Sequence, residues 1–286
     1  MASLKDLRNK IKSVKNIQQV TKAMKMVAAA KLRKSQENME KSRSYTKAVS
    51  EMINHLIPDI DRSLLPMLSK RENKQALFVI ITADRGMAGA FNANVIKEAE
   101  QSVNTFGKEN SCLICIGKKS HDYFKRRDYN IINKYRDCWN ELDFDLALKI
   151  GKEAVNLYEN REVDSVNVIY NEFKNIGSQI VKNKEFLPVT YLIDKEIDKS
   201  CEMLYEPSKE DVVKSLIPKH LNIQMWQFLL ESNASEQAAR MVAMDNATEN
   251  AGEMISDLSV EYNKARQAAI TTEIIEIVSG ANALEG

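Results

Sequence analysis

Apolar residues recur in steps of three and four through the first 57 positions, with no helix-breaking residue among them. This spacing places apolar side chains on one narrow face of an amphipathic α-helix. Pro58 is expected to end the helix. At 1.5 Å per residue it would be about 80 Å long, which exceeds the size of a globular domain. The apolar positions are Leu4, Leu7, Ile11, Val14, Ile17, Val20, Met24, Val27, Val49, Met52 and Leu56.

A second amphipathic pattern runs from Ser208 to the C-terminus, with alternating steps of four and three in its clearest section. This is the heptad spacing of a coiled coil, and its many alanines predict a slim helix. We expect a bend or break at Pro218, and Gly252 should be tolerated only where two backbones approach closely. The residues of the pattern are Ala234, Ala238, Met241, Ala251, Ile255, Leu258, Tyr262, Ala265 and Ala269.

The middle of the chain alternates short apolar runs with amphipathic stretches. Strand-like runs lie at 76–82, 111–117, 129–135, 163–173 and 179–194, and helix-like stretches lie between them, including 94–106 and 144–160. This alternation predicts a mostly parallel sheet covered by helices. The predicted fold is therefore α/β plus a long antiparallel coiled coil. Its parts are an N-terminal helix (1–57), a central Rossmann-like α/β domain (58–207) and a C-terminal helix (208–286).

The net charge of +1 conceals an uneven distribution. Residues 1–57 hold 13 Lys and Arg against 4 Asp and Glu, a net charge of +9, whereas residues 208–286 hold 6 against 12, a net charge of −6. Opposite charges favour pairing of the two ends with each other, because self-pairing would place like charges together. Pairing of each helix with its own copy or with another protein is the alternative.

Composition excludes several classes of protein. With 44% hydrophobic residues, 9 Gly and 5 Pro, the chain is neither collagen-like nor disordered. No segment approaches the roughly 20 apolar residues that span a bilayer, and the N-terminus lacks the apolar core of a secretory signal. Four irregularly spaced cysteines indicate a reducing cytosol rather than a disulfide framework.

Two glycines, Gly86 and Gly89, follow a predicted strand and precede a predicted helix. Phosphate-binding loops occur at such places. The spacing matches neither Gly-x4-Gly-Lys-Ser/Thr nor Gly-x-Gly-x-x-Gly, so a structural turn is the favoured interpretation. Cys112 and Cys115 resemble half of a zinc or redox motif. Residues three apart in a strand face opposite sides, however, which favours a structural role for this pair.

No combination of residues predicts catalysis. The histidines His55, His121 and His220 lie in unrelated segments without partners at motif spacing, so we expect no triad, no metal site and no cofactor. The basic N-terminal helix could bind nucleic acid. Its lysines surround a regular apolar stripe, and no aromatic residue precedes Tyr45, which favours solvated or protein-facing charge.

Both ends of the chain resemble one known family. The segments KIKSVKNIQQVTKAMKMVAAAKLRKSQ (10–36) and SEQAARMVAMDNATENAGEMISDLSVEYNKARQAAITTEIIEIVSGANAL (235–284) are similar to the terminal helices of the F-type ATP synthase gamma subunit. TADRGMAGAFNAN (82–94) and MLYEPS (203–208) resemble its strand–turn segment and its return toward the last helix. The family's turn commonly reads Gly-Leu-Cys-Gly-Gly, whereas this turn begins Gly86-Met87-Ala88.

This resemblance implies a rotor shaft without catalytic residues of its own. The coiled coil would stand inside a threefold ring of alpha and beta subunits, and the foot would sit with the epsilon subunit on the membrane c ring. Ion-driven rotation would then take each beta subunit through its catalytic states in turn. The implied location is the cytoplasmic side of the cell membrane, as a peripheral protein. Cys201 stands alone, so the thiol regulation of plastid forms is not expected.

The resemblance also assigns contact residues. Met24 matches a position near the beta-subunit loop that couples rotation to catalysis, although periodicity alone would make it a seam residue. Tyr205 matches the foot region near the c ring. Five further residues match positions that act with Met24, directly or through helix contacts: Arg240, Arg266, Gln267, Thr271 and Glu273. The alternatives are a coiled-coil adaptor with an α/β head, which would not copurify with alpha and beta subunits, and an autonomous nucleotide enzyme, which would turn over ATP alone.

Overall fold

The computed structural model describes residues 4–56, 66–69, 71–139, 142–189, 206 and 208–285. Internal contacts divide the chain into two compact units. Met1–Ala28 with Met241–Gly286 form one, named the terminal unit here, and Ala29–Arg240 form the other, named the central unit. Each long helix at the ends of the chain contributes a segment to both units.

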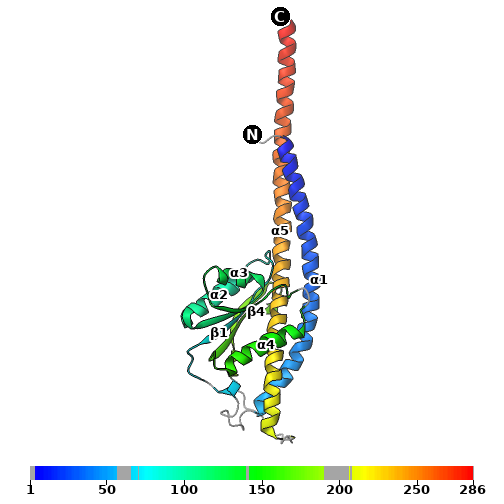
Figure 1. Ribbon diagram of the computed structural model, residues 1–286. Helices are drawn as coiled ribbons and strands as arrows, with labels where there is room; N and C mark the ends of the chain where they lie inside the picture. The colour runs from blue at the N-terminus through cyan, green and yellow to red at the C-terminus, as the bar shows by residue number, and fades with distance from the viewer. Residues whose placement is uncertain are drawn as a thin grey trace. The chain divides into compact units, whose positions relative to one another are not determined.

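These two helices are α1 (Leu4–Leu56) and α5 (Lys209–Glu285), drawn in blue and in yellow to red in Figure 1. The Ser208 hydroxyl caps α5 by accepting a hydrogen bond from the Asp211 backbone N–H at 3.1 Å. The break expected at Pro218 is absent, because α5 continues through this residue. Proline removes one helical hydrogen bond, but its neighbours Ile217 and Leu221 are fully buried, and their packing keeps the helix continuous.

The central unit contains a five-stranded sheet in the order β3-β2-β1-β4-β5. The first four strands pair in parallel and β5 pairs antiparallel to β4, which confirms the prediction of a mostly parallel sheet. The strands are β1 (Ala76–Ile81), β2 (Ser111–Ile116), β3 (Ile131–Tyr135), β4 (Ser165–Asn175) and β5 (Ser178–Leu187). The remaining elements are α2 (Phe91–Phe106), α3 (Lys118–Lys125), α4 (Phe144–Glu159), η3 (Pro66–Leu68) and η4 (Lys108–Asn110).

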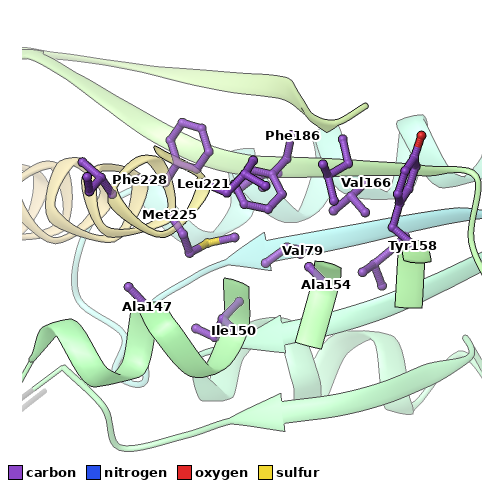
Figure 2. Packing of buried hydrophobic residues seen from close by; sticks show 14 of the residues in the cluster. Val79, Ala147, Ile150, Ala154, Tyr158, Val166, Phe186, Leu221, Met225 and Phe228 are labelled. Atoms are coloured by element: carbon purple, nitrogen blue, oxygen red, sulfur yellow. The ribbon is translucent and has the colours of Figure 1, made fainter. Parts of the chain in front are cut away.

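Side chains of β1, β2 and β4 are buried on both faces of the sheet. Along β1, Leu77 and Val79 face a core formed with α4 and the first half of α5, whereas Phe78 and Ile80 face a second core formed with α2 and α3. Figure 2 shows the first core, which includes Leu221, Met225 and Phe228 of α5 and Ala147 and Ile150 of α4. This double burial explains why β1 reads as an uninterrupted apolar run.

The last predicted strand differs in extent from the observed one. The run at 179–194 corresponds to β5, which ends at Leu187, and residues 190–194 lie outside the described part of the chain. A tight turn at Ile176 and Gly177 joins β4 to β5, with the Gly177 N–H donating to the Asn175 side-chain oxygen at 3.0 Å. The hairpin makes β5 antiparallel, since a short connection cannot return a strand in parallel.

Candidate functional site

In the terminal unit, α1 and α5 pair along a heptad seam. Buried or half-buried positions of α1 recur at alternating steps of four and three, and the predicted seam of α5 is likewise its least exposed face. This confirms the predicted intramolecular antiparallel pairing. The seam positions of α1 are Leu7, Ile11, Val14, Gln18, Thr21, Lys25 and Ala28. Those of α5 are Ala251, Ile255, Leu258, Tyr262, Ala265 and Ala269.

Polar contacts fix the register in the middle of this seam. The Thr248 hydroxyl donates to the Thr21 hydroxyl at 2.7 Å, and the Gln18 amide donates to the Thr248 carbonyl at 3.4 Å. Lys25 and Asp245 form an ion pair at 2.5 Å. A side-chain carbon added at Gly252 would lie 3.1 Å from the Gln18 side-chain amide nitrogen, so Gly252 leaves room for a side chain of α1 rather than for its backbone. Polar groups at seam positions favour one register over others.

The predicted seam of α1 is wrong between Ile17 and Val27, whereas Val49 further along the helix is buried as predicted. Ile17, Val20 and Val27 are each more than half exposed, and the polar Gln18 and Thr21 occupy the seam instead. Met52, assigned to the same stripe in the lower part of α1, is also exposed. The cause is that two faces of this helix offer the same periodicity, and only one of them meets α5.

Met24 shares the exposed stripe with Ile17, Val20 and Val27, since the four positions recur at steps of three and four. Its side chain is half-buried, and the seam positions beside it are Thr21 and Lys25. Met24 is therefore not the seam residue that periodicity alone suggests. This second stripe is named the α1 outer stripe below (Ile17, Val20, Met24, Val27).

The last part of α5 has no helical partner among the described residues. Every position from Ile270 to Asn282 is exposed, and Figure 1 shows the red end of α5 continuing past the beginning of α1. Large apolar side chains nevertheless recur here on one face, at Ile270, Ile274 and Ile277, with the last 70% exposed. This face is named the α5 outer stripe. An exposed apolar stripe on a helix marks a surface for another macromolecule.

Four predicted contact residues border the α5 outer stripe. Arg266 and Glu273 are seven positions apart on one side of it, and Gln267 and Thr271 are four positions apart on the other. All four are exposed, and the Thr271 hydroxyl donates to the Gln267 carbonyl at 2.9 Å. Within the described residues neither Arg266 nor Glu273 forms an ion pair, so their charges are directed to solvent.

Arg240 lies in the central unit and is almost fully buried. One guanidinium nitrogen donates to the Gly86 carbonyl at 2.7 Å, and another donates to Glu236 Oε1 at 2.5 Å. Burial raises the pKa of the Glu236 carboxyl, and the hydrogen bond and charge of Arg240 oppose that rise. The Arg240 guanidinium is thus already hydrogen-bonded to groups of the same chain. Sequence reasoning missed Glu236, although its position four residues before an arginine on a helix was a usable signal.

The loop after β1 is held by the same network of protein contacts. The Asn92 side-chain oxygen accepts from the Ala83 N–H at 2.9 Å, and the Asp84 carboxylate accepts from the Lys118 N–H at 2.9 Å. Gly89 has a φ of 55°, a left-handed conformation that suits glycine. Since the loop's own backbone and carboxylate groups bond within the chain, its geometry is that of a structural turn.

The cysteines of β2 face opposite sides of the sheet, as predicted. Cys112 packs against the core shared with α4, and Cys115 lies in the core shared with α2 and α3. Burial raises the pKa of the Cys115 thiol to about 12, so the thiol is protonated and unreactive at neutral pH. His121 and His220 are buried far apart in sequence, on α3 and α5. Tyr205, Cys201 and the side chain of His55 lie outside the described residues.

Within the described part of the chain, no cluster of His, Cys, Asp or Glu could hold a metal ion. None of its helices combines the length and apolarity that crossing a bilayer requires. Three features remain. Two long helices pair along a seam that contains polar contacts, each helix carries an exposed apolar stripe outside the seam, and an α/β sheet packs against the first half of α5. These features define a coiled-coil subunit of a larger assembly.

The comparisons with known proteins agree with that class. Residues 3–284 match the ATP synthase family. The ATP synthase gamma chain of Prosthecochloris aestuarii is 49% identical over 294 residues and that of Chloroherpeton thalassium 46% over 301 residues, with 99–100% of each chain covered. The chain belongs to the family of F-type ATP synthase gamma chains, the rotor subunits of the central stalk.

Solved structures show the same fold. A chain from the Euglena gracilis mitochondrial ATP synthase, solved as OSCP/F1/c-ring, superposes with a TM-score of 0.71 at 22% identity, covering 98% of this chain and 94% of that one. A chain from the central stalk and c-ring of Tetrahymena thermophila mitochondrial ATP synthase gives 0.62 at 26% identity, covering 80% and 99%. Paired terminal helices around an α/β sheet are therefore shared with these rotors.

Proposed function

We propose that this chain is the non-catalytic central shaft of a rotary ATP synthase. In this role it transmits ion-driven rotation of the c ring to the catalytic beta subunits. The observation that carries the proposal is the pair of outer stripes on the terminal unit. Seven large apolar side chains, from Ile17 on α1 to Ile277 on α5, lie off the seam, and the described part of the chain leaves six of them exposed and Met24 half-exposed. A surrounding protein surface would remove them from water.

The partner subunits follow from this assignment. The alpha and beta subunits, as a threefold hexamer, would contact the outer stripes and the bordering Arg266, Gln267, Thr271 and Glu273. Arg240 would act on these contacts indirectly, because the Gly86 carbonyl and Glu236 already bind its guanidinium. The epsilon subunit and the c ring would contact the foot region that includes Tyr205. The chain would then be a peripheral protein on the cytoplasmic side of the cell membrane.

A pair of matched substitutions tests the contact with the hexamer. Ile274→Asp places a charge on the α5 outer stripe, whereas Ile275→Asp places the same charge one residue away, on an exposed face outside it. Copurification with alpha and beta subunits should fall for Ile274→Asp and persist for Ile275→Asp, with both variants folded by circular dichroism. Equal copurification of the two variants would contradict the contact.

The non-catalytic assignment has a separate test. The isolated full chain should release no phosphate from ATP, while the assembled complex containing it should hydrolyse ATP. Nucleotide turnover by the isolated chain would support the autonomous enzyme instead. A folded, tagged chain that never copurifies with alpha or beta subunits would support the adaptor.

A further inference from the structure

A pocket in the central unit is lined mainly by basic and amide side chains. It lies between α1, β5 and α5 and has a volume of about 360 Å³. That volume falls in the range of small-molecule sites, about 300–1,000 Å³. Its lining includes Arg43, Lys47, Lys184, His220, Gln224 and Gln227. The pocket is remote in sequence from every contact residue assigned above.

The lining carries surplus positive charge. Arg43 Nη2 lies 3.8 Å from Glu231 Oε1, and Lys47 Nζ lies 3.8 Å from Glu51 Oε1 in an exposed pair that contributes little. Lys184 forms no ion pair with a carboxylate of the described residues, and its Nζ lies 5.6 Å from the centre of the Phe228 ring. No carboxylate lines the pocket. Three cations therefore converge on one space, with a single buried carboxylate, Glu231, behind them.

A buried histidine adds a neutral donor. The His220 side chain is 5% exposed, lines the pocket, and its Nδ1 has no hydrogen-bond partner. Burial and, to a lesser extent, the charge of Lys184 together lower the pKa of His220 to about 4, so the imidazole is neutral at pH 7. An unpartnered buried nitrogen costs free energy that a bound acceptor would recover.

We propose that this pocket binds the phosphate group of a small ligand, with Arg43, Lys47 and Lys184 balancing its charge and His220 Nδ1–H donating to an oxygen. Phosphate oxygens accept several charge-assisted hydrogen bonds at once, which matches a site lined by three cationic donors and no carboxylate. No Phe, Tyr or Trp is among the lining residues, so a nucleobase would find no large aromatic side chain on which to stack. The proposal is independent of the rotor function, since it depends only on side chains of the central unit.

Isothermal titration calorimetry on the full chain tests the site. Inorganic phosphate and pyrophosphate are titrated at constant ionic strength, against chloride as the reference. The wild-type chain should bind, and Lys184→Gln should weaken binding about tenfold by removing one charge-assisted contact. Lys182→Gln is the matched control, because Lys182 lies on the same strand and pairs with Glu172 at 3.8 Å instead of lining the pocket. This control should bind like the wild type.

Two further experiments identify the source of the phosphate group and test the hydrogen bond to His220. Vesicles containing phosphatidylglycerol, compared with phosphatidylcholine vesicles, test whether the phosphate is a lipid headgroup; binding that Lys184→Gln weakens would assign it so. Nitrogen NMR of the His220 ring should show Nδ1 shifting on addition of phosphate. Absence of binding to both probes, equal weakening by Lys182→Gln and Lys184→Gln, or an unchanged Nδ1 signal in the bound state would each overturn the proposal.

Discussion

At the scale of single residues, Arg240 and Glu236 form a buried ion pair on α5. Both side chains are about nine-tenths buried, and a second hydrogen bond from Arg240, to the Gly86 carbonyl, joins α5 to the loop after β1. Arg240→Ala should lower the free energy of unfolding of the full chain by about 3 kcal/mol, because it leaves a carboxylate buried without its cation. Urea denaturation followed by circular dichroism measures the change.

The control for this prediction is Arg33→Ala. The pair between Arg33 and Glu37 is exposed, so its loss should change the unfolding free energy by less than about 0.5 kcal/mol. Adding Glu236→Gln to Arg240→Ala should restore part of the loss by removing the stranded charge. A double variant less stable than Arg240→Ala would show that the carboxylate is not the source of the penalty.

His220 gives the chain a pH dependence with a definite sign. Its pKa falls from an ordinary 6.5 to about 4 in the folded chain, so between these values the unfolded chain binds a proton that the folded chain does not. Stability is therefore lost as the pH falls from 6.5 to 4, by up to about 3 kcal/mol. Burial raises the pKa of the Glu231 and Glu236 carboxyls, which acts in the opposite direction.

Comparison with His220→Gln isolates the histidine from these carboxyls. The unfolding free energy of each protein is measured by urea denaturation from pH 7 to pH 4. The difference, wild type minus variant, should decrease as the pH falls through this window, whatever its value at pH 7. A difference that stays constant with pH would show that His220 titrates normally in the folded chain.

At the scale of elements, the carboxyl ends of β1 and β2 meet so closely that one glycine is required. Gly117 has a φ of 89°, and a side-chain carbon there would collide with the Thr82 carbonyl. Gly89 also has a positive φ, yet open space surrounds it. Gly117→Ala should lower the unfolding free energy by about 3 kcal/mol or more, through steric overlap added to backbone strain. Gly89→Ala should cost only about 1 kcal/mol, from strain alone.

Thermal and urea denaturation of the two variants measure this contrast. The isolated chain suffices, because both glycines lie within the central unit. Similar losses for Gly117→Ala and Gly89→Ala would mean that the edge of the sheet can open to admit a side chain. The close approach of β1 and α3 would then be an incidental feature of the packing.

The elements themselves were largely predictable from the sequence, and the face each helix buries was less so. Heptad spacing predicts the seam of α5 correctly because alanines mark a single face. On α1 the spacing offers two faces between Val14 and Ala28, and the apolar face is not the one that meets α5. The choice depends on hydrogen bonds that join Gln18 and Thr21 to Thr248, more than 220 residues away, and no local pattern reveals them. Likewise Pro218 predicts a break, but tertiary burial of its neighbours outweighs the local penalty.

The opposite net charges of the two ends correctly predict that the ends pair, but few of these charges form ion pairs between the two helices. Opposite charges predicted that the ends pair, and they do, yet the described residues show just two interhelical ion pairs, Lys25–Asp245 and Arg43–Glu231. Most basic side chains of α1 are exposed instead. Seam packing therefore holds the helices together, and the positive surface of α1 is available to an acidic partner.

At the scale of the whole molecule, each helix of the terminal unit has a face for its partner helix and a different exposed apolar face, which the proposed function assigns to other subunits. This separation of faces lets a substitution alter transmission of rotation without unfolding the chain. Met24 is the sharpest case, since it lies on the α1 outer stripe beside the seam and is half-buried. Met24→Lys should leave the unfolding free energy within about 0.5 kcal/mol of the wild type, as expected for a site outside the core.

In the assembled complex, Met24→Lys should lower coupling more than assembly, because it adds a charge where an apolar contact with a beta subunit is expected. Proton pumping per ATP hydrolysed, measured in inverted membrane vesicles, should fall while alpha and beta subunits still copurify. Met26→Lys is the matched control, since Met26 is 61% exposed and lies off both the seam and the outer stripe. Pumping that stays proportional to hydrolysis in Met24→Lys, or falls equally in Met26→Lys, would show that the stripe does not transmit rotation. A fall confined to Met24→Lys would assign the coupling contact to one face of one helix.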